Sequence, residues 1–368
     1  MNDKIKSIVL TVLSAVILLT LSVWCIVKPG PGYSDSERRV LASFPEITWE
    51  SILSADFMSD FEDYAVERFP MRDVFRSVKA LSEKYIFVKK DNNDIYTADG
   101  HLSKLEYPLS TYMLDNASEK FLYIYEKYIE GTESEVYFSI VPDKNYFLAE
   151  ENGYLSLDYD ELVSYMKEKT SYMTYIDIID KLSADDYYTT DTHWKQECIT
   201  DIAGYIGECM GADVKADYTE NTLDNPFYGV YYGQSALPFN ADTMKYLTSE
   251  VIENCVVTSY DTGKPVKKSV YDMEEAYGKD PYEMFMSGSD ALVVAENPLA
   301  ETDRELVMFR DSFAGSLSPL LLEGYSKITL VDIRYINPQM LGAFVDFSDC
   351  DVLFIYSTML LNNSTAFR

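Results

Sequence analysis

The chain is poor in the residues that most often build metal centres and disulfide frameworks. It has two histidines and five cysteines in 368 residues. No cysteine and histidine spacing matches a zinc site, and the cysteines are not arranged as a disulfide framework. Cys198 and Cys209 lie eleven residues apart in a helical pattern, so we expect both in the core. We expect no metal and no organic cofactor.

Positive charge is also scarce. There are 31 lysines and arginines against 61 acidic residues, which gives a formal charge of −30 and a pI of about 4.3. Such a chain repels phosphate, which excludes nucleic acid as a partner, and it disfavours a polyanionic glycan unless the cleft is locally basic. The hydrophobic content of 47% and the aromatic content of 14% are typical of a globular protein, and the 31 tyrosines are many for this length. Tyrosine suits carbohydrate surfaces, although most of these rings are expected to serve packing.

One long stretch without formal charge, residues 7–27, is present near the N-terminus. At about 1.5 Å per residue it spans a bilayer core as a helix. Lys4 and Lys6 favour an N-terminus inside the cell. A cleaved signal peptide is the alternative, but its apolar region would be shorter and would end in small residues. We predict an uncleaved single-pass anchor in the cell membrane, a cytoplasmic tail over residues 1–6, and the bulk of the chain outside.

The remaining chain predicts a linker and one large domain. Residues 28–48 are rich in Pro and Gly and then charged, and a helical pattern follows from 49 to 90, interrupted at Pro70. Beyond it, apolar runs typical of strands buried on both faces alternate with helical segments. The runs are 135–142, 291–296, 305–310, 327–333 and 351–357, and the helical segments are 158–170, 194–210 and 314–323.

Strand and helix in alternation indicate an α/β fold with a mostly parallel sheet flanked by helices. We therefore assign residues 49–368 to one extracytoplasmic domain. Within it, residues 212–290 are irregular and are expected to form long loops or a small β insertion.

One of the two histidines stands in the sequence "DTHW". Asp191 and His193 are separated by one residue, so in an extended segment both side chains point to the same side. A carboxylate on Nδ1 fixes the imidazole tautomer and leaves Nε2 free as a base. The pair is expected at a strand-to-helix junction. Such a base needs a nucleophile.

The best candidate nucleophile is Ser312 in "ELVMFRDSFAGSLSPLLLEGY". An apolar strand is expected to end at Arg310, and a helix is expected to begin after the small residues Ala314 and Gly315. A serine on a strand-to-helix turn has the layout of a nucleophile elbow, where the helix N-terminus offers N–H groups to an oxyanion. The Ser312 N–H is the first choice for one such donor. The alternative is that Asp311 or Ser312 simply caps the helix.

Several separated motifs resemble one known group of proteins. They are "SERRVLASFPEIT", "FEDYAVERFPMRD", "VPDK", "TDTHW", "FYGVYYGQSA", "VMFRDSFAGSLSPLL" and "ITLVDIRYI", and they extend from about residue 36 to the end. Their order is similar to that of the SGNH-hydrolase-like alginate O-acetyltransferases of the AlgX/AlgJ type. It is most similar to their relatives in Gram-positive bacteria, the DHHW family.

The resemblance implies a Ser–His–Asp triad with Ser312 as nucleophile, His193 as base and Asp191 as the orienting acid. Thr192 replaces the second histidine of the family's name, but it lies between two triad positions. "RDS" replaces the "GDS" of ordinary SGNH enzymes, so their oxyanion donors are not carried over. The resemblance also implies a polysaccharide acceptor and a membrane-bound O-acyltransferase as the source of the acetyl group.

Other residues of these motifs are candidate substrate contacts. Arg334 is placed to hold a carboxylate or an acetyl oxygen, or else it pairs with an acidic neighbour. Tyr228, Tyr231 and Tyr232 are placed to stack on sugar rings, or else they pack a hairpin.

Two further residues have simpler expectations. Trp194 is a possible substrate contact, but we expect a core residue that holds His193 in place. His101 follows a turn and is expected in a solvated loop.

Three functions remain open from the sequence. The first is an extracellular O-acetyltransferase that moves an acetyl group onto a hydroxyl of a cell-wall or exopolysaccharide glycan. The second is a glycan acetylesterase that uses the same triad. The third is an inactive glycan-binding or assembly module of the same fold.

Overall fold

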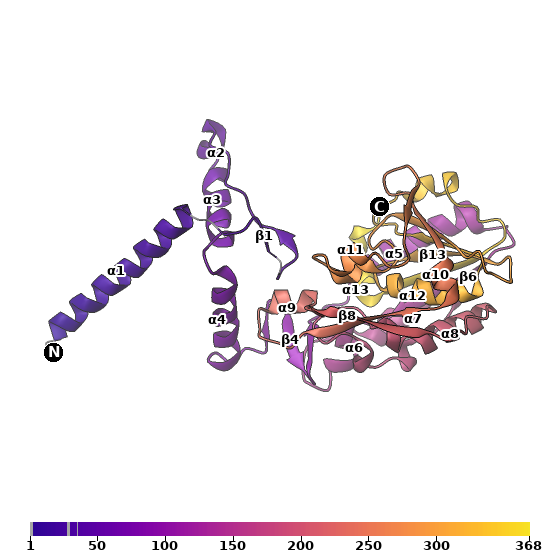
Figure 1. Cartoon of the computed structure of the whole chain (residues 1–368), viewed down its shortest axis with the longest axis horizontal. Helices are drawn as coiled ribbons and strands as arrows, with labels where there is room; N and C mark the ends of the chain where they lie inside the picture. The colour runs from indigo at the N-terminus through magenta and orange to yellow at the C-terminus, as the bar shows by residue number, and fades with distance from the viewer. Residues whose placement is uncertain (1–2, 28–29, 35) are drawn as a thin grey trace. The chain divides into compact units, whose positions relative to one another are not determined.

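The structure is a computed structural model that describes residues 3–27, 30–34 and 36–368 (Figure 1). The chain forms two compact units. Unit 1 comprises Met1–Asn93 and Tyr232–Phe239, and unit 2 comprises Asp94–Tyr231 and Asn240–Arg368. Residues 49–93, which the sequence analysis placed with the large domain, are therefore part of unit 1.

Unit 1 is built mainly from helices. Its elements are α1 (Asp3–Val27), β1 (Tyr33–Ser34), β2 (Arg39–Val40), α2 (Trp49–Leu53), α3 (Asp56–Glu67), α4 (Arg72–Tyr85) and β3 (Asp91–Asn92). The Thr48 hydroxyl caps α2 by accepting a hydrogen bond from the Ser51 N–H at 3.1 Å. The helical pattern breaks near Pro70, as the sequence predicts, and Met71 takes a left-handed φ of 59° before α4.

Helix α1 contains the long uncharged stretch. The segment Asp3–Trp24 is long and apolar enough to cross a membrane, and none of its residues is buried. A signal sequence near an N-terminus has the same properties. The helix is thus compatible with either an anchor or a signal sequence.

Unit 2 contains an eight-stranded sheet in the order β11-β10-β12-β14-β13-β15-β6-β7. The five strands from β14 to β7 run parallel, whereas the pairs β12–β14, β10–β12 and β10–β11 are antiparallel. The predicted α/β fold with a mostly parallel sheet is confirmed. The strands are β6 (Glu135–Val141), β7 (Thr174–Tyr175), β10 (Val256–Ser259), β11 (Val266–Lys268), β12 (Leu292–Glu296), β13 (Glu305–Arg310), β14 (Lys327–Val331) and β15 (Asp351–Ser357).

The central strands are apolar along most of their length because helices cover both faces of the sheet. Leu306 and Met308 of β13 pack in a core with α8 (Thr200–Met210) and α12 (Phe313–Leu321). Val307 and Phe309 point to the opposite face, where α5 (Thr111–Ile124) and α7 (Tyr159–Lys169) complete a second core. This burial explains why continuous apolar runs in the sequence predict strands that are covered on both faces.

The region 212–290 contains strands and short helices as well as loops. An antiparallel pair, β8 (Thr219–Phe227) and β9 (Asp242–Thr248), forms the small β insertion. β10 and β11 from the same region extend the main sheet. The remaining elements are β4 (Ile95–Ala98), β5 (His101–Lys104), α6 (Lys144–Leu148), α9 (Val230–Ser235), α10 (Glu250–Asn254), α11 (Met273–Ala276) and α13 (Thr358–Leu361), with short 3₁₀ and π turns between them.

Two expectations about single residues are wrong. His101 lies in β5 and is only 4% exposed, so it is not a solvated loop residue. Cys209 is exposed because α8 turns Ile202 and Ile206 toward the core instead, and Cys198, in the 3₁₀ turn before α8, is half-buried.

Candidate functional site

The Asp-x-His motif lies in an irregular loop and not in the extended segment expected from the sequence. The loop spans residues 187–194, and an isolated β-bridge between Tyr187 and Trp194 closes it. The Tyr188 N–H donates to the His193 carbonyl at 3.0 Å. This closed loop folds the chain back so that the side chains of Asp191 and His193 meet.

Asp191, His193 and Ser312 form a continuous hydrogen-bonded row. The distance from Asp191 Oδ1 to His193 Nδ1 is 2.6 Å, and His193 Nε2 lies 2.8 Å from Ser312 Oγ. The Asp191 side chain is 1% exposed and that of His193 is 13% exposed, whereas Ser312 is half-buried. The carboxylate is thus shielded from water, whereas the serine as a residue is partly exposed.

Ser312 stands where β13 passes into α12. It occupies the N-cap position of α12, but its hydroxyl makes no capping hydrogen bond and points to His193 instead. The neighbouring Asp311 carboxylate accepts from the Phe313 N–H at 3.0 Å and from the Ser357 N–H at 2.8 Å. Asp311 therefore ties the turn to the end of β15 and fixes the position of the serine.

Aromatic side chains hold the imidazole in place. The ring of Tyr282 stacks on that of His193, with centroids 3.8 Å apart and planes 8° apart. The Phe313 ring lies 5.0 Å from the imidazole, and the Trp194 Nε1–H donates to the Phe313 carbonyl at 2.9 Å. Trp194 is fully buried, which agrees with its expected role as a core residue and leaves no face for a substrate.

No sequence pattern predicted the role of Tyr282. It comes from the region interpreted as irregular, about 90 residues after the motif, and its hydroxyl lies 2.8 Å from Ser316 Oγ. Only the fold brings this ring onto His193.

Two charged side chains that sequence reasoning missed support the first half of the loop, residues 188–190. The Asp242 carboxylate accepts from the Thr189 and Thr190 N–H groups, both at 2.8 Å. Lys144 Nζ donates to the Tyr188 carbonyl at 2.8 Å. Burial lowers the pKa of Lys144 to about 7. Its motif, "VPDK", was noted only as part of the resemblance.

The backbone of residues 229–230 approaches Asp191 closely. The Val230 N–H donates to Asp191 Oδ2 at 2.8 Å, which leaves both carboxylate oxygens bonded. A Cβ at Gly229 would lie 2.4 Å from the Asp191 Cα. Only glycine allows this approach, which explains the "FYGV" sequence in physical terms.

Of the predicted substrate contacts, Arg334 and Tyr231 are engaged within the fold, whereas Tyr228 is exposed. Arg334 forms an ion pair with Asp332, with Nη2 2.6 Å from Oδ2, which is the simpler of its two expected roles. Tyr231 is 3% exposed and its hydroxyl donates to Thr192 Oγ1 at 3.1 Å, so its ring packs the loop and is not available to a sugar. Tyr228 is 43% exposed. Tyr232 belongs to unit 1.

No group of three or more His, Cys, Asp or Glu side chains is placed to hold a metal within the described ranges. The chemistry that this arrangement supports is nucleophilic, because an imidazole oriented by a carboxylate accepts the proton of an attacking hydroxyl.

Comparison with known proteins identifies the fold. No family model and no curated protein matches the sequence. A DHHW family protein from Eubacterium siraeum is 21% identical with a TM-score of 0.63, covering 75% of this chain and 94% of that one. Bacillus cereus PatB1 with a sulfonyl adduct is 21% identical with a TM-score of 0.58, covering 73% and 95%.

A weaker likeness is to the O-acetyltransferase domain of Pseudomonas putida AlgJ, with 11% identity and a TM-score of 0.42, covering 73% of this chain and 92% of that one. The neighbours with a TM-score above 0.5 include a member of the DHHW family that the sequence motifs resemble. The first two share the fold of this chain.

Proposed function

We propose that this chain is a membrane-anchored extracytoplasmic O-acetyltransferase that moves an acetyl group through Ser312, His193 and Asp191 onto a polysaccharide hydroxyl. The observation that carries the proposal is the pair of distances, 2.8 Å and 2.6 Å, that links the three side chains in the order of their proposed roles. The sequence resemblance and the fold shared with a DHHW family protein support it.

In the first half-reaction, Ser312 Oγ attacks the carbonyl carbon of an acetyl ester and His193 Nε2 takes the hydroxyl proton. Collapse of the tetrahedral intermediate releases the donor alcohol, which receives that proton, and leaves acetyl-Ser312. Asp191 keeps Nδ1 protonated and stabilises the imidazolium. The Ser312 N–H at the start of α12 is the proposed donor to the oxyanion.

In the second half-reaction, a sugar hydroxyl attacks the acetyl-serine. His193 takes the proton of that hydroxyl and returns it to Ser312 Oγ, which restores the enzyme. The exposed ring of Tyr228 is proposed to stack on the acceptor, which is a polysaccharide of the cell wall or an exopolysaccharide. A membrane-bound O-acyltransferase is the proposed source of acetyl groups, and α1 as anchor would keep the domain beside it.

Ser312→Ala tests the nucleophile. Removal of a serine nucleophile of this kind is expected to reduce turnover of an activated acetyl ester by at least about 10³-fold. The same variant should lose labelling by a sulfonyl fluoride, mapped by peptide mass spectrometry, because PatB1 of this fold is known with a sulfonyl adduct. Asn363→Ala, at an exposed C-terminal position, is a control that should keep full activity. Full activity of Ser312→Ala would refute the proposal.

Transfer and hydrolysis are separated by a different measurement. Water and sugar hydroxyls compete for one acyl-enzyme, so a glycan acetylesterase would use the same triad. An acetyl donor incubated with an oligosaccharide acceptor should give a product heavier by one acetyl group. Release of acetate alone would assign the chain to the esterase class, and neither product would favour a binding module.

A further inference from the structure

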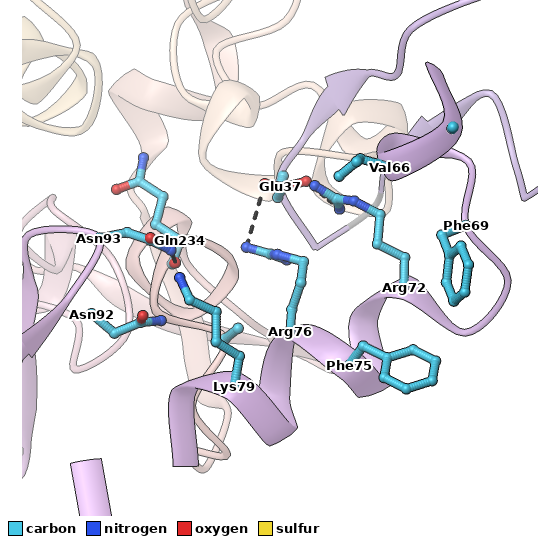
Figure 2. A pocket seen from close by; sticks show the side chains of 12 residues that line it. Glu37, Val66, Phe69, Arg72, Phe75, Arg76, Lys79, Asn92, Asn93 and Gln234 are labelled. Carbon is cyan, nitrogen blue, oxygen red and sulfur yellow. Dashed lines mark hydrogen bonds and ion pairs between the residues drawn. The ribbon is translucent and has the colours of Figure 1, made fainter. Parts of the chain in front are cut away.

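Unit 1 contains a cavity of about 900 Å³ that the proposed chemistry does not use (Figure 2). Residues of α3 and α4 line it together with Glu37, Asn92, Asn93 and the segment around Gln234. No triad residue belongs to its lining. The question is what this cavity binds.

The lining is divided into an apolar and a polar end. Phe69 and Phe75 pack edge to face with centroids 5.6 Å apart, and Val66 beside them is 62% exposed. Figure 2 shows this aromatic pair at one end of the row of side chains, whereas Lys79 and Asn93 lie at the other. Such a division suits a ligand with an apolar chain and a polar head.

The polar part is cationic, although the chain as a whole is strongly acidic. Of the charged side chains that line the cavity, Arg72, Arg76 and Lys79 are cations and Glu37 is a carboxylate, which pairs with Arg72 at 2.5 Å and with Arg76 at 3.3 Å. Two carboxylates outside the lining also lie near these cations: Asp73 is 3.6 Å from Arg76, and Glu83 is 3.9 Å from Lys79. Residues 72–90 carry six lysines and arginines against these two carboxylates, so the surroundings of the cavity remain positive and favour an anionic head.

The polar end is also structurally fixed. Arg76 Nη2 donates to the Gly233 carbonyl at 2.7 Å, and Asn92 Nδ2 donates to the Ser235 carbonyl at 2.7 Å. Asn93 Nδ2 adds a bond of 2.8 Å to the Gln234 carbonyl. These bonds hold residues 233–235 against α4 and preform the wall of the cavity.

The apolar surface continues beyond the cavity. Exposed apolar side chains follow one another along α4 and the segment after it, and several lysines accompany them. The apolar residues are Val74, Val78, Tyr85, Ile86, Phe87 and Val88, and the lysines are Lys84, Lys89 and Lys90. An apolar stripe with basic flanks is typical of a helix that lies in a membrane interface.

We propose that the α3–α4 cavity binds an anionic phospholipid of the membrane in which α1 is anchored. The acyl chain would lie on Val66, Phe69 and Phe75, and the phosphate would lie at Arg76 and Lys79. The inference rests on the anchor of the proposed function, because α1 keeps unit 1 at a bilayer. It does not depend on the triad.

The test uses the full chain in lipid nanodiscs with two photoreactive lipids. Both carry a diazirine in the acyl chain, and one has a phosphatidylglycerol head and the other a phosphatidylcholine head. We expect the anionic lipid to label peptides of α3 and α4 about fivefold more than the neutral one, since one cation at an anionic surface contributes about a fivefold preference. Peptides of α1 should be labelled equally by both.

Lys79→Gln is the decisive variant because the Lys79 side chain is 58% exposed and its nearest carboxylate, on Glu83, is 3.9 Å away. It should fold normally and lose most of the preference for phosphatidylglycerol. Lys268→Gln in the exposed strand β11 is the matched control and should change nothing.

The outcomes separate the two proposals. Equal labelling of α3 and α4 by both lipids, or labelling of α1 alone, would overturn the lipid site while the anchor stands. Absence of labelling in α1 as well would overturn the anchor. Cross-links between two copies through α4 would overturn the lipid site in favour of a dimer surface.

Discussion

The two units of the chain differ in how they use apolar side chains. In unit 2, strands and helices bury apolar residues on both faces of the sheet, and even the polar loop that carries Asp191 is buried. In the described part of unit 1, α2 and α3 contain no buried residue, and α4 buries only Ala80. Unit 2 thus gains stability from its own core. Unit 1 leaves apolar surface exposed, which a membrane or a binding partner would cover.

The comparison also explains why the candidate site is in unit 2. A triad requires three side chains held within a fraction of an ångström, and this requires rigid surroundings. Each of the groups at the site is fixed by at least one neighbour: Asp191 by the Val230 N–H, His193 by Tyr282, and the Ser312 turn by Asp311. Helices without a buried core would not provide that rigidity.

Gly229→Ala is expected to disturb the candidate site in unit 2 more than any other variant described below. The new methyl group would lie 2.4 Å from the Asp191 Cα, so the loop backbone has to move. We expect turnover of an acetyl ester to fall by about 10²-fold, because a displacement near 1 Å has such an effect. The kinetics of acetyl-ester hydrolysis by the variant would measure this loss of turnover.

The control for this variant is Gly204→Ala in α8, where a Cβ meets no atom within 4 Å. Alanine favours a helix over glycine, so unfolding free energy should rise by about 0.5–1 kcal/mol with activity unchanged. Equal activity of the two variants would show that the approach of Gly229 to Asp191 is not needed.

Paired truncations in the two units sharpen the contrast in burial. Leu320→Ala in α12 removes a fully buried side chain and should lower the unfolding free energy by about 2–5 kcal/mol. Val78→Ala in α4, where the side chain is 54% exposed, should change it by less than about 0.5 kcal/mol. Urea unfolding of both proteins measures the difference, and similar losses would contradict the comparison.

Lys144 gives unit 2 a pH dependence of stability. Its pKa is about 7 in the folded chain because of burial, against 10.5 when exposed, so between these values the unfolded chain binds one proton more. Stability should therefore rise with pH above about 7, by up to about 1.4 kcal/mol per pH unit. Lys144→Met should reduce that slope in urea unfolding between pH 7 and 9.5. An unchanged slope would mean that the buried amine is not its source.

The smallest expected effect is that of Tyr282→Phe. Phenylalanine keeps the ring that stacks on His193 and removes only the hydrogen bond to Ser316. Activity should stay within about twofold, with a stability loss of about 1 kcal/mol. Tyr282→Ala should lower activity much more, and equal effects of the two variants would show that the ring does not position the imidazole.

The sequence by itself determined five strands of the main sheet, β6, β12, β13, β14 and β15, and the identity of the three triad candidates. Apolar runs such as 305–310 and 351–357 are strands because burial on both faces demands continuous apolar residues, and this requirement is local. A chain with two histidines also leaves few choices for a base. Ser312 was predictable since a strand that ends before small residues and a helix defines its turn.

Only the tertiary structure decided what holds these residues together. Tyr282, Asp242 and Lys144 contact the loop from 44 to 89 positions away, and no local pattern encodes such contacts. The fold also buries Tyr231 but leaves Tyr228 exposed, and it places His101 in a buried strand instead of the expected solvated loop. Local periodicity specifies which face of an element is apolar, but the partner that covers that face is a property of the whole fold.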